Sequence, residues 1–214
     1  MKRTLVTAAI LSMGASALLA GISLSQNPVT QPVAPAIKSV LQIVPGASSL
    51  DAFRHPSGLF VDQARGVFLV ADRGNHRLVL FDASARCRGT IPFRASSAGE
   101  EPGEPLTLAA DAAGRMFVVD ALEPGVRVLT SRGSRLGNLE LPFPKDTGSR
   151  PQSVDIGSSG SIYLLCGGPR GGVVVTDHNG RPLDGEGLTP GMEPLGSAVA
   201  LAVNEAAGLM TIAL

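Results

Sequence analysis

Short apolar runs of about four to six residues alternate along the chain with turns rich in Gly, Asp, Asn and Pro. Within the runs, alternating polarity and β-branched residues dominate over any helical spacing, which is typical of strands. The clearest stretch predicts strands at 58–61, 67–71, 77–81 and 89–92, with turns at 62–66 and 72–76. We expect these strands to form one four-stranded antiparallel sheet.

The same unit recurs along the chain. The Gly that precedes the second run of each copy stands at Gly66, Gly114, Gly160 and Gly208, so the spacings are 48, 46 and 48 residues. A four-stranded unit of this size matches a propeller blade, and a single blade cannot shield its two faces without stacked neighbours. The sequence therefore predicts an all-β fold, a β-propeller over residues 37–214, with blades that begin near 53, 103, 149 and 196.

The first unit carries a distinctive set of residues: Pro56, Gly58, Leu59, Phe60, Val61, Asp62, Gly66, Leu69, Val70, Ala71, Asp72, Asn75, His76, Arg77, Leu78 and Phe81. This pattern resembles the NHL repeat, which is named for an Asn-His-Leu signature. The resemblance is partial in the second unit, where Glu123 and Gly125 replace the Asn and the Arg, and weak in the third, where Cys166 takes the Asp position. It implies a β-propeller, commonly six-bladed, that serves mostly for binding and in some relatives for catalysis.

The number of units predicts a partial or truncated ring, with the last blade incomplete. Three units and half of a fourth follow Pro56, whereas six would need about 280 residues. An open stack exposes strand edges and one blade face, which favours self-association. Three interpretations stay open: a truncated frame or fragment, an arc completed by a second chain, and a degenerate four-bladed ring. Residues 37–43 could supply an outer strand.

The N-terminal segment has the pattern of an export signal. Lys2 and Arg3 precede an uncharged run over 5–20, and Ala15 and Ala17 offer a small-x-small cleavage site. Residues 1–24 are therefore predicted to be a signal peptide. The alternative is an uncleaved anchor at 5–24, which is about long enough to span a bilayer. Residues 25–36 read as an extended linker, and the protein is expected to be extracytoplasmic, either secreted or periplasmic.

The charge balance bears on which molecules the chain can bind, and the two cysteines bear on its redox state. Lys plus Arg and Asp plus Glu both number 18, so no field draws the chain to nucleic acid, and a membrane is expected only through the anchor. Cys87 and Cys166 would meet an oxidising compartment, where they either form a disulfide or serve as two small buried hydrophobes.

One end of the predicted blades carries the candidate ligand-binding face. Loops that join second to third strands, and those between blades, open together around a propeller channel. The chain has three histidines, and the third, His178, lies in a turn that does not belong to these loops. A metal site with three histidine ligands therefore cannot form on this face, and no metal or cofactor is predicted. The predicted members of the face are His55, Arg73, His76, Asp120, Glu123 and Arg170, with Arg54 and Arg150 nearby.

The recurrent acidic residues are expected to be structural. Asp62, Asp111 and Asn204 each end a first strand and can accept N–H groups from the following turn. Asp72 and Asp120 repeat after second strands, and we expect Asn75 and Arg77 to brace the turn they occupy.

No hydrolase signature such as Gly-x-Ser-x-Gly or His-Glu-x-x-His occurs in the chain. The sequence therefore favours an extracytoplasmic binding scaffold whose ligand is a protein, a small molecule or a glycan. The alternative is a propeller enzyme of lyase or lactonase type, for which His55, His76, Asp120 and Glu123 are the acid/base candidates. A third hypothesis is a non-functional remnant.

Overall fold

The computed structural model describes residues 6–9, 52–94, 101–123, 125–141, 148–168, 171–183 and 198–213. Contacts divide the chain into one unit of residues 1–10 and 53–214 and a second unit of residues 11–52. The second unit lies outside the described residues apart from Ala52. The predicted linker at 25–36 and the predicted outer strand at 37–43 fall in it.

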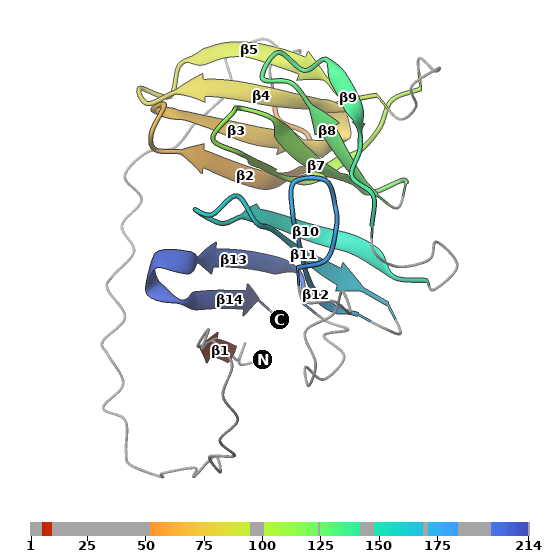
Figure 1. Ribbon diagram of the computed structural model, residues 1–214. Coiled ribbons are helices and arrows are strands. Elements are labelled where there is room, and N and C mark those ends of the chain that lie inside the picture. The colour runs from red at the N-terminus through yellow and green to blue at the C-terminus, as the bar shows by residue number, and fades with distance from the viewer. Residues whose placement is uncertain are drawn as a thin grey trace, which may run out of the picture. The chain divides into compact units, whose positions relative to one another are not determined.

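Two successive sheets each contain four antiparallel strands that pair in chain order. Blade 1 consists of β2 (Pro56–Asp62), β3 (Val67–Asp72), β4 (Arg77–Asp82) and β5 (Cys87–Pro92). Blade 2 consists of β6 (Pro105–Ala110), β7 (Met116–Asp120), β8 (Val126–Leu129) and β9 (Arg135–Asn138). The four-stranded antiparallel blade predicted from the sequence is confirmed in both (Figure 1).

The two remaining sheets have three strands each among the described residues. Blade 3 consists of β10 (Arg150–Ile156), β11 (Ile162–Gly167) and β12 (Gly172–Thr176). Blade 4 consists of β13 (Ala200–Asn204), β14 (Leu209–Ala213) and β1 (Val6–Ala9), which pairs with β14. The helical elements that the structure describes are two 3-10 turns, η1 (Arg73–Asn75) and η3 (Glu205–Ala207).

Consecutive blades pack face to face, with β2 against β6, β6 against β10 and β10 against β13. A separate buried apolar cluster fills each of the three interfaces. All five residues of β7 are buried, because Met116 and Val118 face blade 1 while Phe117 and Val119 face blade 3. Within the described part of the chain these clusters join only neighbouring sheets, so the fold is a propeller-type stack that does not close.

A bulge recurs where each of the first three blades begins. The register shifts directly after Pro56, Pro105 and Pro151, which pair with Asp72, Asp120 and Cys166. Proline donates no backbone hydrogen bond to a sheet, so a bulge is a position that tolerates it. The shared register places Cys166 in the position of the recurrent aspartate, as the sequence comparison predicted.

The two cysteines are free, so of the two alternatives left open by the sequence the disulfide is not formed. Cys166 is buried between blades 2 and 3, as the second interpretation predicted. That interpretation fails for Cys87, which is exposed because it begins the outer strand β5, whose first four residues all face solvent.

The segment predicted as an export signal contributes β1, and its residues 1–5 and 10–24 lie outside the described part of the chain. Of the described residues, none form a helix with the length and apolar character needed to cross a bilayer.

Candidate functional site

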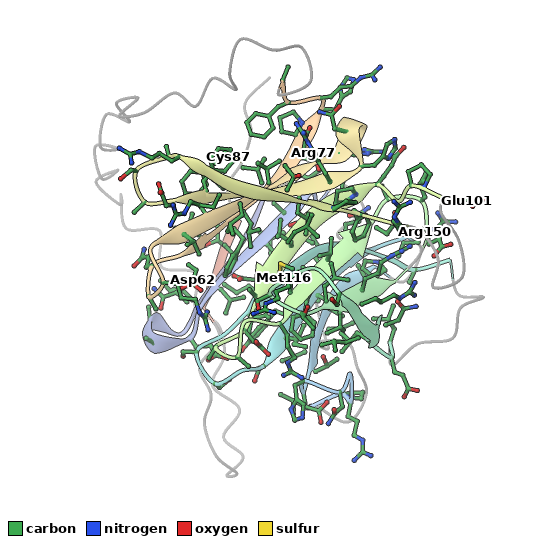
Figure 2. The ribbon with its side chains drawn as sticks, turned by 90° about the horizontal axis from the view of Figure 1, so that it is seen from above. Asp62, Arg77, Cys87, Glu101, Met116 and Arg150 are labelled. Atoms are coloured by element: carbon green, nitrogen blue, oxygen red, sulfur yellow. The ribbon has the colours of Figure 1, made fainter. Side chains whose placement is uncertain are left out.

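The polar residues at the far end of the first strands close turns. Asp62 Oδ1 accepts the Arg65 N–H at 2.9 Å, and Asp111 Oδ1 accepts the Arg115 N–H at 2.8 Å. Asn204 Oδ1 accepts the Ala207 N–H at 3.1 Å. Their predicted structural role is confirmed. Figure 2 labels Asp62 and Arg77, which mark the two opposite ends of blade 1.

At the other end of blade 1, the buried carboxylate of Asp72 organises the turn between β3 and β4. Its Oδ1 accepts the Arg54 N–H at 2.7 Å. Its Oδ2 accepts Asn75 Nδ2 and Arg77 Nε, each at 2.7 Å. The prediction that Asn75 and Arg77 brace this turn is confirmed.

Asp120 occupies the same position in blade 2 and forms an ion pair with Arg127 at 2.5 Å, with both side chains almost fully buried. Arg127 also donates to Glu123 at 2.9 Å and to the Arg94 carbonyl, and its guanidinium lies 5.0 Å from the centre of the Phe93 ring. Burial lowers the pKa of Arg127, while the carboxylates of Asp120 and Glu123 oppose that shift. Arginine stays charged in proteins, so the pair is ionic.

Sequence comparison missed Arg127 because its register differs from that of Arg77. Arg77 pairs directly with Asp72 across β3 and β4, whereas Arg127 pairs with Val118, two positions before Asp120. The side chain of Arg127 therefore reaches back along the sheet to its carboxylate. An arginine on the strand after a recurrent Asp is the signal that would have found it.

The predicted face of blade 1 meets the chain as it enters blade 2. The Arg73 guanidinium lies 2.7 Å from Glu104, and His76 Nδ1 lies 2.9 Å from the Gly103 carbonyl oxygen, to which it donates. The Glu104 N–H in turn donates to Asp120 Oδ1 at 3.1 Å. Residues 103–104 therefore connect the predicted members of the two blades.

The other predicted members stand apart from this connection. His55 is exposed at the start of blade 1, and Arg150 is exposed at the start of β10. Arg54 contributes its backbone N–H to Asp72. Glu123 is half-exposed and holds Arg127. Arg170 lies outside the described residues.

The face has little free acid/base chemistry. Asp120 and Glu123 are both paired with Arg127, and His76 is fixed by a backbone carbonyl. In the part of the chain that the structure describes, no three His, Cys, Asp or Glu side chains are placed to hold one metal ion. Burial raises the pKa of Cys166 to about 12, so this thiol is neutral and a poor nucleophile.

A groove opens where the outer strand of blade 1 faces the β8–β9 hairpin of blade 2. Its volume is about 440 Å³. We call it the inter-blade groove. Gly133 of the hairpin packs directly against Ile91, since a Cβ at this position would overlap Ile91 Cγ2. The groove is lined by Thr90, Ile91, Pro92, Phe93 and Arg94 of blade 1 and by Arg127, Leu129, Arg132, Gly133, Ser134 and Arg135 of blade 2.

Residues 53–81, which include β2, β3 and most of β4, match the family described as the NHL repeat. The resemblance predicted from the sequence is therefore confirmed for residues 53–81.

Comparison with curated proteins gives no match. Among solved structures, the chain is similar to hydrazine synthase of Kuenenia stuttgartiensis, with 15% identity and a TM-score of 0.45 over 69% of this chain and 36% of that one. It is also similar to a protein of unknown function from Bacteroides caccae, with 17% identity and a TM-score of 0.45 over 65% of this chain and 47% of that one. A streptogramin B lyase shares 15% identity with a TM-score of 0.43 over 68% of this chain and 44% of the lyase. The chain thus spans less than half the length of each structure.

Proposed function

We propose that this chain is an extracytoplasmic ligand-binding module of the NHL-propeller type and that the inter-blade groove is its binding site. The observation that carries the proposal is a groove of about 440 Å³ whose walls combine apolar side chains with guanidinium groups. Pockets for small molecules have volumes of about 300–1,000 Å³ and the same mixture of apolar walls and a few polar groups.

Binding without turnover is favoured by the state of the nearby carboxylates. Asp120 and Glu123, the acidic members of the predicted face, both hold Arg127, which lines the groove. A general base needs a free carboxylate or imidazole within reach of its substrate. Asp120 and Glu123 therefore act as positioning residues for a groove arginine.

The groove can be tested with a fragment library and the methyl NMR signals of Ile91 and Leu129 in the full-length chain. We expect at least one fragment to shift both signals. Thr90→Trp, which replaces an exposed groove residue, should abolish the shift. Gln63→Trp, on an exposed turn elsewhere in blade 1, should leave it intact.

The outcomes separate the proposal from its alternatives. A library without any groove ligand, or equal shifts in Thr90→Trp and wild type, would reject the groove as the site. Turnover of a bound fragment by the wild-type chain would reject binding without catalysis.

Location is tested separately by fusing a reporter enzyme that needs disulfide bonds to the C-terminus of the full chain. We expect activity outside the cytoplasm that falls in Lys2→Glu/Arg3→Glu, because a positive start is part of the export signal. Arg86→Glu/Arg88→Glu makes the same charge change on the exposed surface of blade 1 and should export normally. A reporter that stays silent in the wild type contradicts export.

A further inference from the structure

The charges that line the inter-blade groove all have one sign. Its lining contains Arg94, Arg127, Arg132 and Arg135 and no Asp or Glu. The whole chain has equal numbers of acidic and basic residues, so this gathering is a local feature rather than a consequence of composition.

Neutralisation of these arginines is uneven. Arg127 has two carboxylate partners, Asp120 and Glu123. Among the described residues, neither Arg132 nor Arg135 takes part in an ion pair. Two of the four guanidinium groups therefore bring uncompensated positive charge to the groove.

Arg135 also has unused hydrogen-bonding capacity. Its Nη2 donates to Asn138 Oδ1 at 2.9 Å, whereas its Nη1 is buried and has no partner among the described residues. A buried donor without an acceptor costs about 1–3 kcal/mol, and more when the group is charged. An oxygen atom of a bound anion would remove that cost.

Arg135 is close enough to Arg127 for their charges to interact. Burial is the main cause that lowers the pKa of Arg127, and the positive charge of Arg135 lowers it further. Asp120 and Glu123 offset the charge of Arg127, but no described carboxylate pairs with Arg135, so an anion bound beside Arg135 would reduce the repulsion between the two guanidinium groups. Arginine suits that role, because its planar fork binds carboxylate and phosphate groups with two parallel hydrogen bonds.

The remaining lining favours an organic ligand over a bare inorganic ion. Ile91, Pro92 and Leu129 supply apolar surface beside the arginines. We propose that the groove binds a small organic anion, with a carboxylate or phosphate group held by Arg132 and Arg135 and an apolar body against Ile91. This inference rests on the proposed function and adds the chemical class of the ligand.

The test is titration of the full-length chain with four probes, followed on the Ile91 and Leu129 methyl signals: benzoate, phenyl phosphate, inorganic phosphate and neutral benzyl alcohol. We expect benzoate or phenyl phosphate to bind more tightly than benzyl alcohol and inorganic phosphate. Arg135→Gln should weaken that binding about tenfold or more, because a charged hydrogen bond is lost. The affinity should also fall as salt rises.

The matched controls are two further arginine replacements. Arg88→Gln removes an exposed guanidinium from the same outer strand but outside the groove and should change the affinity by less than about twofold. Arg132→Gln alters an exposed lining residue and should weaken anion binding even if Arg135→Gln proves unstable.

Each outcome decides the inference. Anion binding that falls in the groove variants and not in Arg88→Gln supports it, and the better of the two aromatic anions identifies the preferred group. Benzyl alcohol binding as tightly as the anions, or equal losses in Arg135→Gln and Arg88→Gln, overturns it while leaving the proposed binding function standing. No shift with any anion overturns it as well, and the fragment screen then decides the proposed function independently.

Discussion

Asp72 and Asp120 occupy one position in consecutive blades, yet they are neutralised differently. Asp72 is surrounded by a backbone N–H, an amide and the Arg77 guanidinium. Asp120 also accepts backbone N–H groups, but its arginine partner, Arg127, is almost fully buried, whereas the side chain of Arg77 is 19% exposed. Removal of one member of a buried ion pair leaves an uncompensated buried charge, which costs more than the pair itself contributes.

We therefore expect Asp120→Asn to lower the free energy of unfolding by about 3 kcal/mol, at the lower end of the usual range because Glu123 still neutralises part of the charge of Arg127. Urea unfolding of the full chain measures this change. Asp111→Asn is the control, since its partner Arg115 is partly exposed and such pairs contribute at most about 1 kcal/mol. Equal losses in the two variants would show that burial of Asp120 is not what matters.

Asp155 connects blades 3 and 4 and has a pH dependence opposite to that of most carboxylates. Its Oδ2 accepts the Val203 N–H at 2.7 Å. Burial raises the pKa of Asp155, and the N–H donors of Val203 and Ile156 counter part of that rise. Its contribution to stability is therefore complete below the ordinary Asp pKa of about 3.9 and is lost as pH rises through the folded value.

Asparagine at position 155 does not ionise, so Asp155→Asn should gain stability relative to wild type as pH rises above about 4, and then level off. Urea unfolding over a pH series measures the difference. Asp177 is the control of opposite sign, because the N–H of Arg181 is the first of the groups that hold the pKa of Asp177 below its usual value. The difference between Asp177→Asn and wild type should stay constant above about pH 4 and vanish only in acid. A flat profile for Asp155→Asn would contradict the burial argument.

The sequence predicted residues whose partners lie within a few positions along the chain in the repeated register, and it missed Arg127, whose register departs from that of Arg77. Asp62 and Asp72 bind groups within a few residues of their own turns, so their roles follow from turn chemistry. Arg127 pairs with Val118 across the sheet, a register that differs from that of Arg77 in blade 1, so comparing the repeated units does not reveal its contact with Asp120. The exposure of Cys87 depended on β5 being an uncovered outer strand, which the hydrophobic pattern alone could not show.

Blades are positioned by the close approach of their first strands. Gly58 on β2 lies so near β6 that a Cβ would stand 2.8 Å from Thr107 Cα and 2.9 Å from the Leu106 carbonyl oxygen. Both are backbone atoms, which cannot relieve the overlap by a rotamer change as a side chain can. The glycine in the NHL repeat is thus required by the spacing of two sheets rather than by a turn.

Gly58→Ala should push β2 away from β6 and lower the free energy of unfolding by about 1–3 kcal/mol, the usual cost of overpacking. Thermal or urea unfolding provides the measurement. Gly89→Ala is matched, because Gly89 is also a strand glycine in blade 1 but has no atom within 4 Å of its added Cβ. If the two variants proved equally stable, the close approach of the strands would not explain the glycine.

Among the elements, the sequence predicted strands and blades well because their signal is periodic, and it missed the groove. The groove depends on how the turn at 130–134 rests against Ile91 of the neighbouring blade. Nothing in either segment alone indicates that contact. The predicted ligand face had the same weakness, since its members were assigned to one edge without knowing that residues 103–104 would lie between them.

The four sheets that the structure describes follow one another, and each apolar cluster belongs to one interface between neighbouring sheets. Leu69 lies in the cluster between blades 1 and 2, and Leu164 lies in the cluster between blades 2 and 3. Stability in such arrays is a sum of blade and nearest-neighbour terms. A substitution that weakens one interface should therefore destabilise the two blades that meet there more than the other blades.

Leu164→Ala removes a fully buried side chain and should cost about 2–5 kcal/mol. Because the lost contacts join blades 2 and 3, amide hydrogen exchange should speed up most in β10, β11 and β12 and least in β3 and β4. Leu69→Ala, a similar deletion one interface earlier, should reverse that order, with the greatest loss of protection in β3 and β4. Uniform loss across all four blades in both variants would mean that the stack unfolds as one cooperative unit, so that its interfaces could not respond independently to a ligand in the groove.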